Sequence, residues 1–328
     1  MAVTAGALTT YLDAARLALA DEMRRDPLVW ALGEDLGRGG VFGQYKGLVE
    51  EFGPERIADT PISEATIMGA AVGAALVGTR PVVEMRFSDF ALCAVDELVN
   101  QAAKARYMFG GQARVPLVVR QPIGAWRSSA AQHSQSLEAW WVHVPGLAVV
   151  APATPADNGG LLKSAIRSDD PVVFLEHKNL WPTSGVVDQP IAPVPLGQAV
   201  VVSPGSDVTL VTWSAMRFVC EAAVAQARAA GLSVELIDLR TLWPWDRDCV
   251  LGSVARTRRL VVAHEAVQVC GVGAELVAAA VEALGPGIAA RRLGAPRIPV
   301  AYAPNLEAEY HVGANQVLAA LQAIAEAR

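Results

Sequence analysis

Short apolar runs alternate along the chain with longer segments whose apolar residues recur at helical spacing. Residues 8–25 show this spacing and predict an opening amphipathic helix, and the apolar run 28–32 predicts a buried strand that ends in a loop. Further strands are predicted at 80–84, 115–120, 148–150 and 172–175, and helices at 64–78, 91–108 and 155–168. This alternation of strand and helix predicts a mostly parallel sheet covered on both faces.

The pattern is interrupted once, by four prolines between Trp181 and Gln198 in a stretch with few large apolar residues. We therefore predict a domain at 1–182, a proline-rich linker at 183–198 and a smaller α/β domain at 199–328. In that second domain, strands are predicted at 208–212, 233–237 and 259–264, and helices at 215–230, 273–284 and 314–327.

Composition narrows the class of protein. The chain has 328 residues, 52% of them hydrophobic, and a net charge of −6, so a large buried core is expected. No block of like charge suggests a nucleic acid or an anionic membrane as partner. The longest uncharged apolar run, 67–78, is too short to span a bilayer, and no signal peptide is evident, so we expect a cytoplasmic protein.

The four cysteines at positions 93, 220, 249 and 270 form no C-x-x-C pair and have no histidine cluster beside them. A zinc site or a disulfide framework is therefore not expected, and the cysteines are interpreted as small core residues.

The segment Asp59-Thr-Pro-Ile-Ser-Glu64 precedes a helix rich in glycine and alanine. One interpretation is structural: Ser63 caps the helix, and Glu64 is an acidic residue in its first turn, which the helix dipole favours. The other is chemical: Glu64 is a carboxyl at the mouth of a cleft, able to hydrogen-bond a ring nitrogen. The local pattern favours the structural interpretation.

Two aromatic residues and a histidine are further candidates. Phe87 and Phe90 follow a predicted strand and can stack on an aromatic ligand, although both are equally typical of a core. His133 lies in Gln132-His-Ser-Gln-Ser136, on a loop after a strand, where it is either an acid–base residue or a structural histidine. The P-loop, dinucleotide-binding and Gly-x-Ser-x-Gly motifs are absent from the sequence.

Taken in order, the motifs resemble one family. They are Gly33-Glu-Asp35, Gly39-Gly-Val-Phe42, Asp59 to Glu64, Arg80-Pro-Val-Val-Glu84, Ala102-Ala-Lys104, Tyr107 to Gln112, His133 to Ser136, Pro145-Gly-Leu147 and Ile237 to Thr241. The set, with its spacing, is similar to the β subunit (E1β) of the thiamine-diphosphate-dependent pyruvate, branched-chain 2-oxo acid and acetoin dehydrogenases. Each motif is weak alone, but the ordered set runs from about residue 8 to the end.

The resemblance implies a pyrimidine-binding thiamine diphosphate domain followed by a transketolase-type C-terminal domain. It also implies an α2β2 assembly with an E1 α subunit, which holds the Mg²⁺ and the diphosphate. The Gly-Asp-Gly motif for that metal is indeed missing from this sequence. The activity implied is decarboxylation of a small 2-oxo acid and reductive acylation of a lipoyl-E2.

Site roles follow from the same resemblance. Glu64 matches the glutamate that hydrogen-bonds the cofactor's aminopyrimidine, and Phe90 matches the aromatic residue packed on that ring, with Ile62 and Phe87 beside it. His133 matches a histidine near the reacting carbon.

The sequence departs from the family at two places. Trp126 and Arg127 add bulk and charge to the loop before His133, so the 2-oxo acid is not specified. The resemblance also implies a potassium site near Ala165, Ser168 and Asp170, but Ser168 and Asp170 stand where Asp and Asn are usual, so no metal is expected.

Three other functions remain open: an acyloin-forming α/β enzyme that works without E2, half of a split transketolase, and a non-catalytic docking subunit. The last two fit less well, because both Glu64 and His133 are present in the family's motifs. A neighbouring lipoyl-domain gene would favour the dehydrogenase over the acyloin-forming enzyme.

Overall fold

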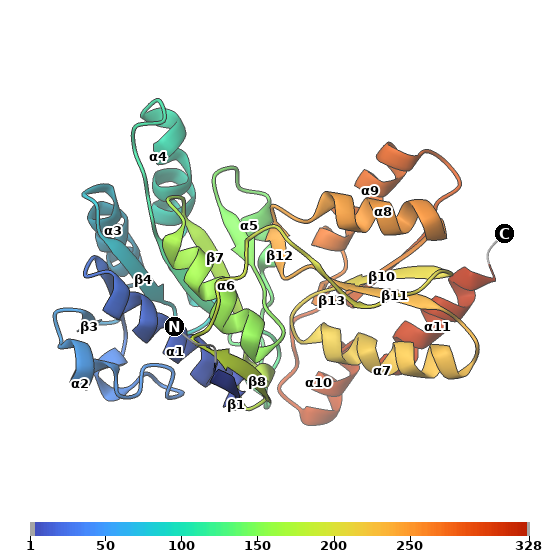
Figure 1. The fold of residues 1–328 in the computed structure, drawn as a ribbon, viewed down its shortest axis with the longest axis horizontal. Coiled ribbons are helices and arrows are strands. Elements are labelled where there is room, and N and C mark those ends of the chain that lie inside the picture. The colour runs from blue at the N-terminus through green and yellow to red at the C-terminus, as the bar shows by residue number, and fades with distance from the viewer. Residues whose placement is uncertain (1–3, 327–328) are drawn as a thin grey trace. The chain divides into compact units, whose positions relative to one another are not determined.

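The structure of the protein is a computed structural model that describes residues 4–326. Within it the chain forms two compact units (Figure 1). The N-terminal unit contains the residues up to Ile123 and Trp140–Leu196, and the C-terminal unit contains Gly124–Ala139 and the residues from Gly197 onward. Both units are α/β, as predicted.

The N-terminal unit is built on a parallel sheet whose strands lie in the order β6-β7-β5-β4-β2-β3. Strands β4, β5 and β7 are buried along nearly their whole length, as central parallel strands must be when helices cover both faces. The strand bounds are Val29–Gly33 (β2), Ile57–Asp59 (β3), Arg80–Glu84 (β4), Val118–Ile123 (β5), Ala148–Val150 (β6) and Val172–His177 (β7).

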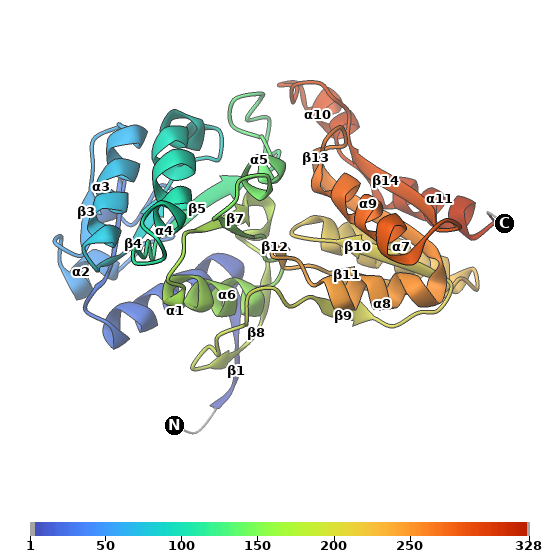
Figure 2. The same cartoon turned by 90° about the horizontal axis from the view of Figure 1, so that it is seen from above.

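Helices cover both faces of this sheet. Figure 2 shows α1 (Tyr11–Arg25) and α6 (Pro155–Arg167) on one face, and α3 (Glu64–Leu76) and α4 (Ala103–Met108) on the other. The apolar faces of α1 and α6 pack against the strands in a single buried core on this face of the sheet.

Two predicted helices differ from the structure. The opening helix begins at Tyr11, because Thr4–Thr10 forms strand β1, which pairs antiparallel with β8 (Ser184–Gln189) inside the stretch predicted as a linker. The stretch 91–108 is not one helix. It consists of a 3₁₀ turn η2 (Phe90–Ala94), a π-helical segment η3 (Asp96–Ala102) and then α4.

Four short elements complete this part of the chain. They are η1 (Leu36–Arg38), α2 (Leu48–Phe52), α5 (Glu138–Val142) and η4 (Lys178–Leu180).

The C-terminal unit has a sheet with the order β14-β13-β10-β11-β9, in which only the edge strand β9 runs antiparallel to its neighbour. Its strands are β9 (Val200–Ser203), β10 (Val208–Thr212), β11 (Val234–Asp238), β13 (Arg259–Val267) and β14 (Ala289–Ala295), and a short strand β12 covers Thr241–Trp243. The predicted strands of this unit are confirmed, although β11 is shifted by one residue and β13 runs three residues beyond its predicted end.

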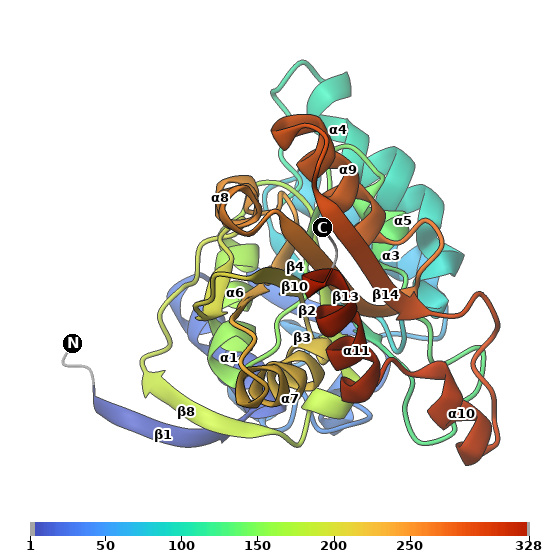
Figure 3. The ribbon, with the colours of Figure 1, turned by 90° about the vertical axis from the view of Figure 1, so that its right-hand side faces the viewer.

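Helices α7 (Met216–Ala229) and α11 (Ala314–Ala325) lie side by side against this sheet (Figure 3), and their apolar faces share a core with β10, β11 and β13. Helices α8 (Arg247–Thr257) and α9 (Val272–Leu284) cover the other face, and α10 (Pro304–Tyr310) precedes α11.

The cysteines correct one expectation. All four are free thiols, but only Cys220 is buried, and Cys93 and Cys270 are exposed rather than part of a core. Over residues 4–326, every helix falls short of the length and apolarity needed to cross a membrane.

Candidate active site

Glu64 is the first residue of α3 and lies just beyond the end of β3. The backbone between them is tied to β2, since the amide of Thr60 donates to the carbonyl of Gly33 at 3.0 Å. Ser63 occupies the N-cap position, but its hydroxyl donates to the side chain of Thr66 at 2.8 Å and makes no capping bond to the backbone. The glutamate is partly exposed, and Ile62 before it is 78% exposed.

A second carboxyl group faces Glu64. Glu34 follows β2 and is 8% exposed, and Arg86 after β4 places its guanidinium 3.6 Å from Glu34 and 2.6 Å from Asp35. Burial raises the pKa of Glu34, Arg86 opposes the rise, and the negative charges of Glu64 and Asp35 add to it. The carboxyl ends of the neighbouring parallel strands β2, β3 and β4 thus bring three acidic side chains and one arginine to one edge of the sheet.

The sequence analysis gave Glu34 and Arg86 no role. A signal was present, because both residues lie just after predicted strands: Glu34 within the quoted motif Gly33-Glu-Asp35, and Arg86 two residues after the motif that ends at Glu84. What was missing was the strand order, which makes β2 and β4 neighbours.

Phe87 and Phe90 belong to an aromatic cluster of four side chains, which also contains Phe42 and Trp181. The rings of Phe87 and Phe90 meet edge to face with centroids 5.6 Å apart, and Phe42 lies 6.2 Å from Phe87 and 4.4 Å from Trp181. The ammonium of the fully buried Lys178 lies 4.7 Å from the centre of the Phe87 ring. Phe87 and Phe90 are both partly buried, so neither is an ordinary core residue.

The acidic edge and the aromatic cluster lie on neighbouring elements. Helix α3, which begins at Glu64, packs against η2, which begins at Phe90. The structure therefore places four of the predicted residues, Glu64, Ile62, Phe87 and Phe90, in the N-terminal unit, on or beside neighbouring elements.

His133 belongs to the C-terminal unit. It lies in the segment 124–139, which packs with the C-terminal unit although both flanking segments belong to the N-terminal one. The amide of Ala125 donates to Glu265 at 2.8 Å, and the amide of Ser128 donates to Glu307 at 3.0 Å. Farther along, the indole of Trp213 donates to Glu138 at 3.2 Å.

The loop before His133 turns tightly. Arg127, Ser128 and Ala130 have positive φ angles, and the guanidinium of Arg127 lies 5.0 Å from the Trp126 ring. The amide of His133 itself approaches the carbonyl of Ala130 at 3.4 Å. No glycine relieves the positive φ angles in this stretch, so its conformation depends on the anchoring bonds of the segment.

The oxygens of the residues considered for potassium already have partners within the chain. The carbonyl of Ala165 accepts from the amide of Ser168, whose hydroxyl in turn bonds both the amide and the carbonyl of Asp170. The carboxylate of Asp170 is paired with Arg106. The chain's own donors thus engage the oxygens that a cation would need, and across residues 4–326 no three or more His, Cys, Asp or Glu residues gather as metal ligands.

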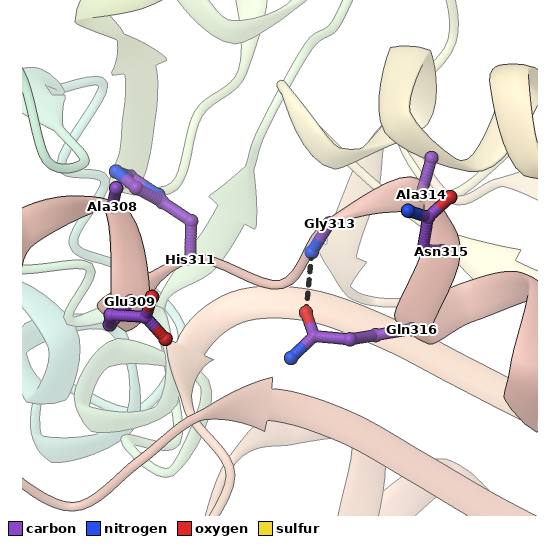
Figure 4. A pocket seen from close by; sticks show the side chains of 7 residues that line it. All are labelled: Ala308, Glu309, His311, Gly313, Ala314, Asn315 and Gln316. Carbon is purple, nitrogen blue, oxygen red and sulfur yellow. Dashed lines mark hydrogen bonds between the residues drawn. The ribbon is translucent and has the colours of Figure 1, made fainter. Parts of the chain in front are cut away.

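The C-terminal unit contains a cavity of about 400 Å³ where α10 leads into α11 (Figure 4). Its lining residues are Ala308, Glu309, His311, Gly313, Ala314, Asn315 and Gln316. The amide of Gly313 donates to Gln316 at 2.7 Å, so the helix start is already capped from within. None of the predicted site residues lines this cavity.

Comparison with known proteins defines the class. Residues 8–183 match the transketolase pyrimidine-binding domain, and residues 197–317 match the transketolase C-terminal domain. A solved structure, a split gene transketolase in an inactive β4 tetramer, superposes with a TM-score of 0.81 over 96% of this chain and 97% of that one, at 22% identity. The chain has the transketolase fold.

Relatives narrow the class. The β subunit of acetoin:2,6-dichlorophenolindophenol oxidoreductase from Cupriavidus necator is 44% identical, covering 92% of this chain and 93% of its own length. The 2-oxoisovalerate dehydrogenase β subunit of Bacillus subtilis is 39% identical, covering 97% and 98%. The pyruvate dehydrogenase E1 β subunit of Rickettsia felis is 45% identical, covering 81% and 82%. The chain therefore belongs to the family of E1 β subunits of 2-oxo acid dehydrogenases.

Proposed function

We propose that this chain is the β subunit of a thiamine-diphosphate-dependent E1 enzyme that decarboxylates a 2-oxo acid. The observation that carries the proposal is that a carboxylate at the first residue of α3 and the aromatic pair Phe87 and Phe90 lie on neighbouring elements. The chain also belongs to a family of E1 β subunits.

The side chains fit the aminopyrimidine half of the cofactor. Phe90 and Phe87 offer an aromatic face and edge, which suit an aromatic ring. Glu64 is partly exposed, so its carboxyl can reach a ring nitrogen, and Ile62 offers an exposed apolar side chain beside it. When bound, thiamine diphosphate supplies the electron sink that allows a 2-oxo acid to lose CO₂.

The protein's part is to orient the ring and to move protons. Glu64 holds or releases a proton at the ring nitrogen, and the buried carboxyl of Glu34, whose pKa is raised, interacts electrostatically with Glu64. Arg86 limits the negative charge at this edge of the sheet. His133 is assigned to proton transfer near the reacting carbon, on a segment whose ends are fixed by bonds to Glu265 and Trp213.

The rest of the enzyme is assigned to partners. An α subunit would hold the diphosphate and Mg²⁺, and two chains of each kind would form an α2β2 assembly. A lipoyl-E2 would take the acyl group. The relatives named as β subunits support the need for an α partner.

The first experiment is a decarboxylation assay of the chain co-produced with its α partner. Pyruvate, 3-methyl-2-oxobutanoate and phenylpyruvate are supplied with thiamine diphosphate and Mg²⁺, with and without lipoyl-E2. We expect CO₂ release together with acylation of E2. No CO₂ from any acid would contradict the proposal.

Replacing Glu64 with Gln should lower kcat by about a hundredfold or more, because the amide cannot exchange a proton. Cofactor affinity, measured by titration calorimetry, should change far less. Glu275→Gln is the matched control, since Glu275 is an exposed acid in the first turn of α9. Equal activity in the two variants would remove Glu64 from the proposed role.

A second candidate is an acyloin-forming enzyme that works without E2. It is favoured by the 44% identity to a β subunit whose name contains acetoin, an acyloin. CO₂ release with an acyloin product and no acylation of E2 would select it.

A further inference from the structure

The segment Gly39 to Gly47, here called the glycine loop, joins η1 to α2 without a helix or strand of its own. Four of its residues are glycines with φ between 75° and 93°. Around Gly43 and Gly47 an added Cβ would meet no atom within 4 Å, so the backbone there is loosely surrounded. Backbone bonds, such as that from the Tyr45 amide to the Gly39 carbonyl at 2.8 Å, set the shape of the loop, and side-chain contacts hold it against the sheet.

Two of these contacts end on one buried carboxyl group. The phenol of Tyr45 donates to Oε2 of Glu84 at 3.0 Å, and the amide of Gln44 donates to Oε1 at 3.4 Å. Gln44 also accepts from the backbone amide of Phe42 at 2.9 Å, so it links the carboxyl to the Phe42 backbone. Glu84, Gln44 and Tyr45 are each 5% exposed or less.

Phe42 is the residue that the loop contributes to the aromatic cluster. Its ring lies 4.4 Å from Trp181 and 6.2 Å from Phe87, which in turn contacts Phe90. A shift of the glycine loop therefore moves the ring that supports Phe87.

Glu84 is poorly neutralised for a buried acid. Arg120 from β5 makes hydrogen bonds to Glu176 of β7 at 2.7 and 2.8 Å, but its nearest nitrogen to Glu84 is 3.4 Å away and makes no hydrogen bond in the part of the chain described. Two carboxyl groups thus share one guanidinium. Burial raises the pKa of Glu84 to about 7, Arg120 opposes the rise, and Glu176 adds to it.

The groups that face Glu84 are few. Arg120, Glu176 and Tyr45 are its charged or titratable neighbours, Gln44 is neutral, and β2 places only Gly33 opposite it in the sheet. Burial and Glu84 raise the pKa of Tyr45 well above its usual value, although Arg120 opposes the rise. Arg120 itself stays protonated, because Glu176 and Glu84 outweigh its burial.

The geometry points to Glu84 as a positioning residue that holds Phe42 against the aromatic cluster through Gln44 and Tyr45 and loosens it on taking up a proton. The ionised carboxylate accepts from both donors, whereas the neutral acid turns one oxygen into a donor and loses an acceptor. The consequence for catalysis rests on the proposed function, but the movement of Phe42 does not.

The test uses the full chain with its α partner, labelled with 4-fluorophenylalanine. The chain has seven phenylalanines, and Phe42→Leu identifies the resonance of Phe42. We expect this ¹⁹F resonance to shift between about pH 5.5 and about 8.5, centred near the pKa of Glu84. In Glu84→Gln it should stay at its acid position throughout, because the amide, like the protonated acid, carries a donor. A wild-type resonance that does not move overturns the inference.

Tyr45→Phe tests the link without removing the buried carboxyl. It keeps the ring and deletes one donor to the carboxylate, so the midpoint should rise by about one pH unit. Tyr11→Phe is the matched control: it deletes a buried phenol bond of 3.1 Å to the Pro152 carbonyl in the same unit. A midpoint that moves equally in both variants, or in neither, overturns the role of Tyr45.

The catalytic consequence is measured separately. In Tyr45→Phe, the apparent affinity for thiamine diphosphate should fall about fivefold, which corresponds to the free energy of one modest hydrogen bond. The kcat should stay within about twofold of the wild-type value. Wild-type affinity in this variant would overturn the connection between Glu84 and the cofactor site. An inactive wild-type enzyme would count against the proposed function, while the ¹⁹F shifts would still decide the role of Glu84.

Discussion

At the scale of single residues, the closest approach between two backbone segments restricts residue 146 to glycine. Gly146 has a φ of 99°, and a Cβ at this position would overlap the carbonyl oxygen of Ala103, which lies in the same unit. The Pro-Gly-Leu motif at this position thus has a steric cause: only glycine lets the turn before β6 approach the start of α4.

We predict that Gly146→Ala lowers the free energy of unfolding by at least about 2 kcal/mol, since strain and overlap act together. Gly78→Ala is the control, because Gly78 has a similar φ of 105° but nothing within 4 Å of the added Cβ. Chemical denaturation of both variants measures the difference. Equal losses would show that the Ala103 contact adds nothing beyond backbone strain.

The same scale shows what the sequence could and could not predict. Glu64, Phe87 and Phe90 were predicted together from motif order, and the structure places them on neighbouring elements. Glu34, Phe42 and Glu84 were not given roles, because their neighbours come from other strands. Tyr45 and Gln44 lie about 40 positions from Glu84, and no local pattern reports such a contact.

At the scale of elements, the two helix starts at Ser63 and Thr154 differ although both residues carry a hydroxyl. Thr154 accepts from the amide of Asp157 at 3.1 Å and so satisfies one free N–H of α6. Ser63 bonds the Thr66 side chain instead and satisfies none in α3. The prediction that Ser63 caps its helix was therefore right in position and wrong in bonding.

This difference in bonding predicts that the two helix starts respond differently to the loss of their hydroxyl groups. Thr154→Ala should lower the free energy of unfolding by about 1 kcal/mol, because it removes a capping bond, and Thr154→Ser should restore most of it. Ser63→Ala should change stability by less than about 0.5 kcal/mol. Thermal and denaturant unfolding of the three variants checks this, and an equal effect at both positions would contradict the assigned bonding.

Elements with strong apolar runs were predicted well, and those stabilised by pairing were not. Strands β4, β6 and β10 match their predictions residue for residue. Strand β8 was hidden inside a proline-rich stretch, because it is defined by its pairing with β1 and carries only one buried residue. The helix predicted at 91–108 has an unbroken apolar pattern, which does not distinguish α from π geometry.

At the scale of the whole molecule, the predicted site residues are distributed over two compact units. Glu64, Phe87 and Phe90 lie in the N-terminal unit, and His133 lies in a segment of the C-terminal unit. The sequence also lacks the Gly-Asp-Gly motif for the metal and diphosphate. Under the proposed function, the cofactor's two ends are held by different chains.

We therefore predict that the isolated chain binds thiamine diphosphate at least about a hundredfold more weakly than the complex with its α partner. The estimate follows because most of the charged contacts to the cofactor, worth about 3 kcal/mol or more, would be absent. Calorimetric titration of the chain alone and of the complex, both with Mg²⁺, gives the comparison. Tight binding by the chain alone would contradict a divided site.

The segment 124–139 has a consequence for the order of synthesis on the ribosome. Its partners Glu265 and Glu307 are translated 140 and 179 residues after Ala125 and Ser128. At typical rates of translation that interval is about ten seconds or more, during which the N-terminal sheet can be completed. The segment 124–139 thus gains these two anchors only after the whole sequence of the N-terminal unit has been made. A truncation after residue 196 would leave that segment without its anchors, however well the parallel sheet around it had formed.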